Sequence, residues 1–461
     1  MIAELGYQGE LADRGQLSER LLQTGLSPKA AAAKAELLAR AAVALRAELP
    51  GSGHQLRAFY VPGRIEVLGK HTDYAGGRTM VAAAERGFVT VVAPRAGRSV
   101  RVIDVGLGDS TEFEIGPDLT PPIGHWSNYP MTVARRLARN FPAARQGATI
   151  ALASDLPSAA GMSSSSALMV SIYCALEEIN RLRATEPFAR NISGPTDLAG
   201  YLGTIENGQT FGTLEGDRGV GTFGGSEDHT AMLCARSGQV SQYSYCPVVF
   251  ERAVRIPAGH TFAVAVSGVV AEKTGAAMAK YNRASRLVSA LLELWRRGTG
   301  QPHQYLARAL ASSPDAAGRL TELVRSGPAG EFPRADLMAR LEHFLVENDQ
   351  VVCGAGDALV RGELEAFARW VERSQQAAEE LLGNQVPQTV ALAAEARKAG
   401  ALCASGFGAG FGGSVWALVD QARADEFLAV WAEAYRKRFP EQSEEAKFFL
   451  TGAGPAACRI C

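Results

Sequence analysis

The order of hydrophobic and polar positions divides the chain into strand-like and helix-like stretches. Residues 148–155 alternate with the period of two that is typical of a strand. In residues 168–176, which follow, apolar side chains recur every three or four positions, as in a helix. Further back, short β-branched runs at 89–93 and 100–103 are separated by Gly and Pro and predict more strands. This half of the chain therefore predicts a sheet followed by helices.

The two ends of the chain predict different structures. Residues 28–40 are dominated by Ala, Leu, Glu, Lys and Arg, which are strong helix formers, so the N-terminal segment is predicted to be a helical elaboration. The last part is predicted to contain a strand (260–266), long helices (276–297 and 335–383) and a final strand (415–419). The predicted division is residues 1–50, 51–245 and 246–461.

The segment 157–166 joins the predicted strand to the predicted helix and reads Pro-Ser-Ala-Ala-Gly-Met-Ser-Ser-Ser-Ser. A turn of small residues that enters a helix presents free backbone N–H groups at the positive end of the helix dipole, which is a cradle for phosphate. No Gly-Lys-Ser/Thr follows it, and it does not match the dinucleotide pattern GxGxxG. The alternative is a helix cap rich in serine.

Composition excludes several functional classes. The chain has 461 residues and a formal net charge of −1, which gives no reason to expect a nucleic acid or an anionic membrane as partner. Cys458 and Cys461 form a C-x-x-C, but no second pair or His cluster completes a metal site. No apolar run reaches membrane-spanning length and the N-terminus does not resemble a signal peptide, so we expect a cytoplasmic protein without a membrane partner.

Two further segments have their own signatures. Residues 61–77 read Val-Pro-Gly-Arg-Ile-Glu-Val-Leu-Gly-Lys-His-Thr-Asp-Tyr-Ala-Gly-Gly, and residues 404–415 read Ala-Ser-Gly-Phe-Gly-Ala-Gly-Phe-Gly-Gly-Ser-Val. With the serine-rich loop they resemble the three ordered motifs of the GHMP small-molecule kinases, most closely the galactokinase branch. The resemblance runs from about residue 57 to residue 419. It implies an α+β fold of two domains with the active site in the cleft between them, ATP and Mg²⁺ as cofactors, a small-molecule sugar as substrate, and a monomer or weak homodimer.

The resemblance also implies roles for residues that face the sugar. Asp228 falls where the family has the carboxylate that accepts or orients the proton of the sugar hydroxyl, and Arg64 is its electrostatic partner. Without the motif order, Asp228 could simply cap a helix. His71 and Asp73 match positions that hydrogen-bond the sugar, and Tyr281 resembles a tyrosine of the sugar pocket, although it could equally be a core residue.

On the nucleotide side the resemblance implies a phosphate-binding loop, a metal site and an aromatic residue near adenine. The loop residues are Ala159, Ala160, Gly161, Met162, Ser163, Ser164 and Ser165. Ser165 and Glu206 are the expected Mg²⁺ ligands, because Mg²⁺ needs few protein oxygens and keeps several waters. Trp126 is the candidate near adenine. The third motif shapes the cleft and supports the serine-rich loop, and its Gly410 is a candidate substrate contact.

The chain departs from the family pattern in its first motif. Galactokinases usually have Asn where this chain has Glu66 and Glu where it has Lys70. Lysine only donates hydrogen bonds, so Lys70 as a substrate contact cannot replace a Glu that accepts them from sugar hydroxyls. Lys70 therefore indicates a substrate with an anionic group such as a hexuronic acid, a compensated pair with Glu66, or a protein that only senses sugar. The anion that meets it is Glu66, Glu227 or the substrate.

These patterns predict an ATP- and Mg²⁺-dependent kinase that phosphorylates the anomeric hydroxyl of a galactose-like monosaccharide. The same reaction on a hexuronic acid is the second possibility. A non-catalytic regulator that binds sugar and ATP is the alternative from another class.

Overall fold

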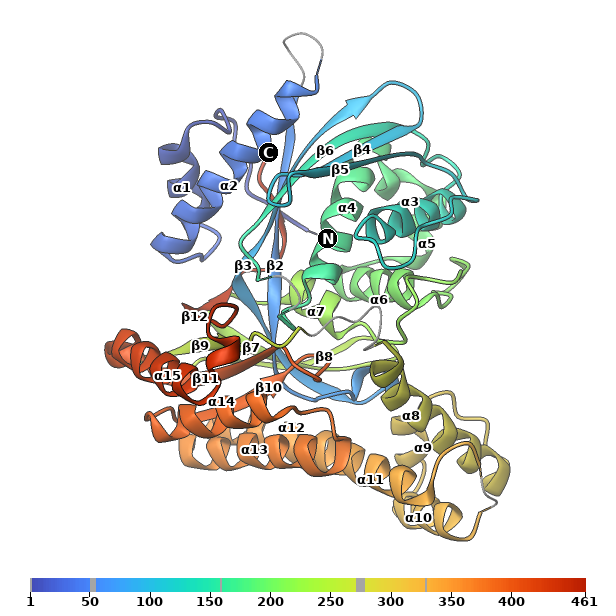
Figure 1. The fold of residues 1–461 in the computed structure, drawn as a ribbon. Helices are drawn as coiled ribbons and strands as arrows, with labels where there is room; N and C mark the ends of the chain where they lie inside the picture. Colours follow the sequence, from blue (N-terminus) through green and yellow to red (C-terminus); the bar gives the residue numbers. More distant parts are fainter. Residues whose placement is uncertain (1, 50–54, 158–159, 271–277, 328–329) are drawn as a thin grey trace.

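A computed structural model of the chain describes residues 2–49, 55–157, 160–270, 278–327 and 330–461. Two β-sheets organise these residues, and helices cover both (Figure 1). The predicted α+β combination of helices and strands is confirmed, and most of the strands pair antiparallel.

Most of the larger sheet lies in the upper part of the molecule in Figure 1, and the sheet continues downward to the level of the smaller sheet. In spatial order its main strands are β1 (Ala3–Glu4), β14 (Cys458–Arg459), β2 (Arg57–Leu68), β3 (Arg78–Arg95), β6 (Gly147–Ser154), β4 (Ser99–Asp104) and β5 (Asp109–Glu114). β7 (Gln239–Ser244) and β13 (Ala453–Gly454) also pair with β3, and β8 (Val249–Arg255) pairs with β7. The predicted strand at 148–155 is β6.

Both faces of the central strands β2, β3 and β6 are buried, and successive side chains point to opposite faces. On β2, Phe59 and Val61 belong to the core beneath α4 (Ser164–Asn180), whereas Ala58 and Tyr60 face the N-terminal helices. Those helices are α1 (Arg14–Leu22) and α2 (Pro28–Ala47), so the predicted N-terminal elaboration is a layer over the sheet. Ser27 caps α2 through its side chain, and Pro28 begins it.

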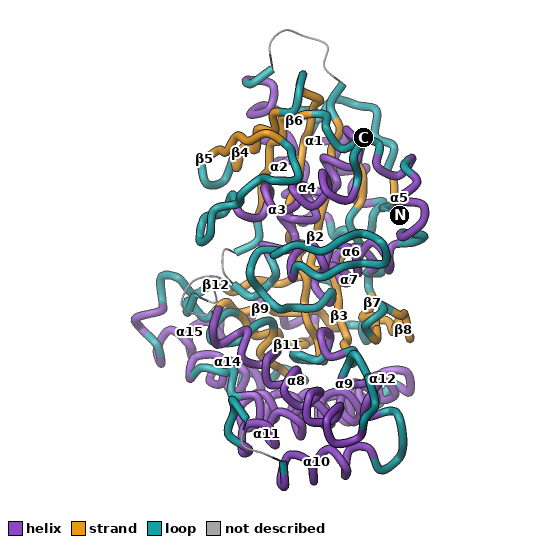
Figure 2. Tube along the Cα trace, turned by 90° about the vertical axis from the view of Figure 1, so that its right-hand side faces the viewer, coloured by secondary structure: helices purple, strands orange, loops and turns teal. Residues whose placement is uncertain are grey.

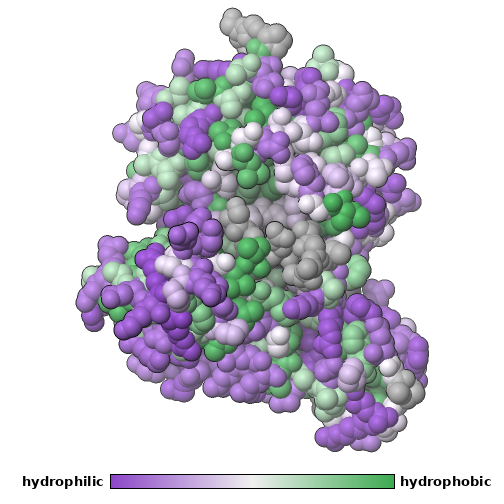
Figure 3. Space-filling model, viewed as in Figure 1, coloured by the Kyte–Doolittle hydropathy of each residue, from purple (hydrophilic) through white to green (hydrophobic). Residues whose placement is uncertain are grey.

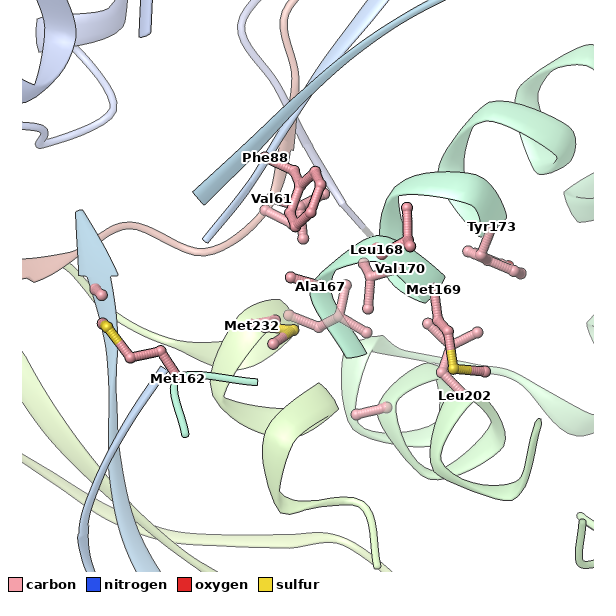
Figure 4. Packing of buried hydrophobic residues seen from close by; sticks show 14 of the residues in the cluster. Val61, Phe88, Met162, Ala167, Leu168, Met169, Val170, Tyr173, Leu202 and Met232 are labelled. Carbon is pink, nitrogen blue, oxygen red and sulfur yellow. The ribbon is translucent and has the colours of Figure 1, made fainter. Parts of the chain in front are cut away.

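The helices that carry the candidate site pack into one hydrophobic core. These helices are α4, α6 (Pro195–Asn207) and α7 (Glu227–Cys234), with α3 (Asn128–Asn140) and the short α5 (Glu186–Asn191) beside them. Figure 4 shows Met169 of α4 beside Leu202 of α6, and Met232 of α7 near Ala167 of α4, with Val61 and Phe88 on the side of the sheet; all belong to one hydrophobic core. Close packing of this kind leaves the first turns of α4 and α7 in fixed positions.

The smaller sheet is antiparallel, in the order β10 (Cys403–Phe407), β11 (Ser414–Asp420), β9 (His260–Val266) and β12 (Lys447–Thr451). α14 (Pro387–Lys398) and α15 (Ala424–Arg438) pack against it. The remaining helices are α8 (Met278–Thr299), α9 (Leu306–Leu310), α10 (Ala316–Ser326), α11 (Arg334–Leu345), α12 (Val352–Arg361) and α13 (Leu364–Ala377), with the π-helical turn η4 (Val346–Val351) between α11 and α12. Figure 2 shows α8 to α12 at the end of the molecule opposite β4 and β5.

The change from one sheet to the other lies later in the chain than residue 246. β8 still pairs with β7, so the larger sheet extends to Arg255, and the smaller sheet begins at His260. The C-terminal strands β13 and β14 also return to the larger sheet. The predicted boundary at 246 therefore cuts through a hairpin, because a strand pairing cannot be read from the local pattern alone.

Hydrophilic side chains cover most of both lobes in the view of Figure 3, and a group of hydrophobic ones lies at the narrow waist between them. Among the described helices, none is both long and apolar enough to span a membrane.

Candidate active site

Arg64 connects the first motif to the serine-rich loop and to Asp228. It lies on β2, and its side chain is only 3% exposed. Its Nε donates to Asp228 Oδ1 at 2.7 Å, and its Nη1 donates to the carbonyl oxygen of Gly161 at 2.6 Å. Its backbone N–H also donates to the carbonyl oxygen of Met162 at 3.3 Å. One buried guanidinium thus fixes the predicted catalytic carboxylate relative to the loop.

Burial alone lowers the pKa of Arg64, but the carboxylates of Asp228, Glu227 and Glu66 outweigh it and raise the pKa above its ordinary value. Arg64 is therefore a permanent cation at the centre of a cluster of acidic residues. Asp228 lies in the first turn of α7, where the helix dipole also favours a carboxylate.

The serine-rich loop has the geometry of an anion site. Gly161 and Ser163 both have positive φ, +71° and +57°, and α4 begins directly afterwards at Ser164. The side-chain oxygen of Ser163 is buried and has no hydrogen-bond partner among the described residues. Ser164 and Ser165 lie in the first turn of α4 and are half-buried. An orphaned hydroxyl beside the N-terminus of a long helix fits a phosphate group.

Two other predicted loop residues support the turn. Ala160 and Met162 are buried, and Met162 packs into the core of Figure 4. Ala159 lies outside the described residues.

The third motif backs this loop, as its resemblance to the family implies. Ser414 Oγ donates to the carbonyl oxygen of Ala160 at 2.5 Å. Gly408 has φ of +81°, and a Cβ there would lie 2.7 Å from the carbonyl oxygen of Gly161, so only glycine allows this close approach. Gly408 and Ala409 line the pocket described below, whereas Gly410 is not part of that lining.

The candidate metal ligand Glu206 is buried on α6 and meets a hydroxyl that the sequence did not single out. Ser166 Oγ donates to Glu206 Oε2 at 2.8 Å and lies 3.3 Å from Asp228 Oδ2. Ser165, the predicted ligand, is the preceding residue and is half-buried. The described residues contain no cluster of three or more His, Cys, Asp or Glu that could hold a metal ion. One carboxylate with one or two hydroxyls is nevertheless a donor set that suits Mg²⁺.

Asp73, His71 and Tyr281, three of the residues predicted to contact the sugar, lie in the same part of the structure. Asp73 Oδ2 accepts the backbone N–H of Glu227 at 3.1 Å, and a Cβ on Gly225 would lie 2.3 Å from the same oxygen. His71 Nδ1 lies 3.0 Å from the hydroxyl of Tyr74, and the rings of His71 and Tyr281 have centroids 5.5 Å apart.

These side chains line one pocket between the two sheets. Its lining consists of Arg64, Glu66, His71, Asp73, Tyr74, Glu206, Gly224, Gly225, Glu227, Asp228, Tyr281, Gly408 and Ala409. Both parts of the chain contribute, so the predicted location between two domains agrees with this lining.

Lys70 does not line the pocket, although the sequence predicts it as a substrate contact. Its side chain is fully buried, and its Nζ donates to Ser374 Oγ of α13 at 2.7 Å. Ser374 in turn donates to Glu347 Oε1 at 2.8 Å, and the same carboxylate oxygen accepts the backbone N–H groups of Gly69 and Lys70. Glu347, which the sequence did not suggest, is therefore linked to the lysine through Ser374, while the charge of Lys70 also acts on Glu66, one of the anions that the sequence suggested.

Trp126 lies just before α3. Its indole N–H donates to Asp109 at 2.8 Å, and it does not belong to the pocket lining. Its role near adenine stays a prediction.

Comparison with known proteins identifies the family. Three family models match: the galactokinase galactose-binding signature at residues 51–94, the N-terminal domain of GHMP kinases at 128–204, and the C-terminal domain of GHMP kinases at 357–437. A galactokinase of Roseiflexus sp. (strain RS-1) is 30% identical over 380 residues, which cover 81% of this chain and 86% of that protein. The chain belongs to the galactokinase branch of the GHMP kinases.

Other members of the branch agree with this assignment. A galactokinase of Exiguobacterium sibiricum is 27% identical over 415 residues, which cover 87% of this chain and 93% of that protein. The crystal structure of Lactococcus lactis galactokinase complexed with galactose superposes with a TM-score of 0.72 at 22% identity, covering 90% of this chain and 97% of that one. The predicted two-domain GHMP fold is thereby confirmed, and this GHMP kinase is a sugar kinase.

Proposed function

We propose that this GHMP kinase transfers the γ-phosphoryl group of ATP to the anomeric hydroxyl of a galactose-like monosaccharide, giving a sugar 1-phosphate and ADP. The observation that carries the proposal is the hydrogen bond from Arg64 to Asp228, because the same guanidinium also contacts the serine-rich loop. One cation thereby holds the base for the acceptor hydroxyl next to the loop that would bind phosphate. Phosphoryl transfer requires these two parts to be close together.

Each described side chain has a part in this reaction. Asp228 accepts the proton of the sugar hydroxyl as that oxygen forms its bond to the γ-phosphorus and the bond from phosphorus to the β-phosphate oxygen breaks. Arg64 keeps Asp228 ionised and offsets charge on the phosphoryl group. Glu206, with Ser165 or Ser166, would hold Mg²⁺, which supplies charge neutralisation between the β- and γ-phosphates. Asp73, His71 and Tyr281 orient the sugar ring.

Replacing Asp228 with Asn tests the mechanism. Asparagine keeps the shape but cannot take the proton, so turnover should fall by about 10²-fold or more, while ATP affinity measured by titration calorimetry stays within about threefold. Asp118→Asn, an exposed loop substitution, is the matched control and should leave turnover unchanged. Unchanged turnover in Asp228→Asn would mean that Asp228 is not the base.

Product analysis tests the acceptor position. The enzyme is assayed with ATP against neutral hexoses, pentoses and hexuronic acids, and the product is mapped by ³¹P and ¹³C NMR. Phosphate on the anomeric carbon supports the proposal, and phosphate on any other carbon contradicts it.

A further inference from the structure

The pocket contains more carboxyl groups than the proposed reaction uses. Five carboxylates line it, and Arg64 is the single Lys or Arg side chain in that lining. Asp228 and Glu206 have parts in phosphoryl transfer, and Asp73 holds the N–H of Glu227. Glu66 and Glu227 remain, two carboxyl groups for which the transfer of a phosphoryl group to a neutral sugar has no need.

Both groups are buried and incompletely satisfied. Glu66 is 3% exposed and Glu227 is 5% exposed. Oε1 of each has no hydrogen-bond partner among the described residues. Arg64 approaches Glu66 Oε2 only to 3.9 Å and Glu227 Oε1 only to 3.6 Å, distances at which charges attract but no hydrogen bond forms. Leaving buried carboxylate oxygens without donors is unfavourable, so these two oxygens can accept hydrogen bonds from a donor that a ligand supplies.

We propose that the sugar substrate carries a protonated amine and that Glu66 and Glu227 receive it. This inference rests on the proposed function and names its substrate class. An ammonium group offers three donors and one positive charge, enough to satisfy both orphaned oxygens, whereas a hydroxyl has a single proton and no charge. A hexuronic acid would add a further anion to the five, and Lys70, the cation expected to meet it, is bound to Ser374 instead.

The contacts also indicate where the amine lies on the sugar. Nε of Arg64 is 2.7 Å from Asp228 Oδ1 and 3.6 Å from Glu227 Oε1, so the two carboxyl groups are neighbours across one nitrogen. A cation bound to Glu227 must therefore lie close to the hydroxyl that faces Asp228. In an aldohexose phosphorylated at C1, the substituent next to that hydroxyl is at C2, so the expected class is the 2-amino-2-deoxyhexoses.

A proton can take the place of the amine, and the experiment separates the two. If Glu66 and Glu227 share a proton in the working enzyme, they behave as a neutral pair and give an amine no advantage. The enzyme would then prefer the neutral sugar.

The test compares kcat/KM for 2-amino-2-deoxygalactose, galactose and 2-acetamido-2-deoxygalactose at a pH below the pKa of the amine. We expect the amine to exceed galactose by about tenfold or more, and the acetamide, which has the nitrogen without the charge, to lose that advantage. In Glu66→Gln and in Glu227→Gln the ratio of amine to galactose should fall by about tenfold, mainly through KM for the amine. Glu19→Gln, an exposed substitution on α1, is the control and should leave the ratio unchanged.

The outcomes are distinguishable from failure of the proposed function. A wild-type enzyme that phosphorylates galactose and shows no preference for the amine overturns this inference and leaves the proposed function intact. A preference for the amine that survives both Gln substitutions overturns the assignment of Glu66 and Glu227. No phosphorylation of any of the three sugars, with ATP bound, overturns the proposed function and the inference together.

Discussion

The hydroxyl of Ser166 donates to the carboxylate of Glu206 at 2.8 Å, which ties the first turn of α4 to α6. The same oxygen lies 3.3 Å from Asp228 Oδ2 on α7, so the predicted metal ligand and the predicted base meet at one serine. Removing a hydrogen bond to a buried carboxylate costs about 1.5–3 kcal/mol and lets that carboxylate turn.

Ser166→Ala should therefore lower kcat by about tenfold and raise the Mg²⁺ concentration at which activity is half-maximal. Steady-state kinetics with Mg²⁺ titration measure both. Ser171→Ala is the matched control, because Ser171 is buried in the same helix and its hydroxyl has no hydrogen-bond partner among the described residues. Equal effects in the two variants would mean that Ser166 only contributes to packing.

Two substitutions of Arg64 should distinguish the effect of its positive charge from the effect of its hydrogen-bonding geometry. Arg64→Lys keeps a cation but cannot contact Asp228 and the carbonyl of Gly161 in the same way, so activity should fall by about 10²-fold with the fold retained. Arg64→Met leaves Glu66, Glu227 and Asp228 without a counter-ion, and should lower the free energy of unfolding by about 3–5 kcal/mol at neutral pH.

Urea unfolding of the two Arg64 variants checks this expectation. The deficit of Arg64→Met should shrink as the pH falls, because a buried carboxyl group that has lost its cation can be neutralised by a proton. A deficit that does not change with pH would contradict the electrostatic role of Arg64.

The sequence predicts where residues of a motif lie. It does not predict the direction of a side chain whose partners are distant in the sequence. Arg64, Asp73 and Asp228 line the same pocket as expected, because Arg64 lies within β2, Asp73 begins a 3-10 turn (Asp73–Ala75) just after that strand, and Asp228 lies in the first turn of α7. The direction of Lys70 is decided by Ser374 and Glu347, which are distant in sequence and belong to no motif. No local pattern carries that information.

Two other differences have similar causes. Ser166 stands in a run of four serines, and the sequence cannot tell which hydroxyl faces a carboxylate until the phase of α4 is known. The predicted boundary at residue 246 places β8 in the second domain, whereas its pairing with β7 keeps β8 in the larger sheet.

The stability of the protein should depend on pH through Glu66. Burial raises the pKa of Glu66 to about 7, from an ordinary value of 4.5. The charged groups that act on it are Arg64, Lys70, Glu227, Asp228 and Glu347. Between pH 4.5 and pH 7 the folded protein keeps a proton that the unfolded chain has released, so this group's contribution to stability decreases as the pH rises through that window.

Glu66→Gln has no such proton to lose. The difference in unfolding free energy between Glu66→Gln and the wild type should therefore grow in favour of the variant from pH 4.5 to pH 7. Urea melts at four or five pH values measure it. A constant difference would mean that the carboxyl group is ionised across the whole window.

Lys70 should affect stability and not the choice between neutral and acidic sugars. Lys70→Glu places a second buried carboxylate beside Glu347, so the free energy of unfolding should fall by about 3 kcal/mol or more. The ratio of kcat/KM for galactose and galacturonic acid should stay within about twofold of the wild type in any folded protein that remains. Lys398→Glu, on the exposed side of α14, is the control for the change of charge. A shift of the ratio toward the neutral sugar would mean that Lys70 contacts the substrate.

The N-terminal layer should stabilise the segment that leads into the serine-rich loop. Lys34 of α2 is fully buried and donates from Nζ to Asp155 Oδ2 at 2.5 Å, while Asp155 Oδ1 accepts the backbone N–H of Gly87 at 2.9 Å. Asp155 follows β6 directly, so this ion pair holds the N-terminal helices to the start of the loop. Burial lowers the pKa of Lys34, and the nearby charge of Asp155 opposes that effect.

Lys34→Met keeps the length of the side chain and leaves Asp155 without its cation. Because the side chain of Asp155 is 25% exposed, water can solvate part of it, and we expect a loss of about 1–3 kcal/mol in place of the full cost of a buried charge. Lys29→Met, on the exposed face of the same helix, should change stability by less than about 0.5 kcal/mol. If α1 and α2 support the loop, Lys34→Met should also raise KM for ATP more than KM for the sugar. Equal changes in KM for ATP and in KM for the sugar would mean that the N-terminal layer only stabilises the sheet.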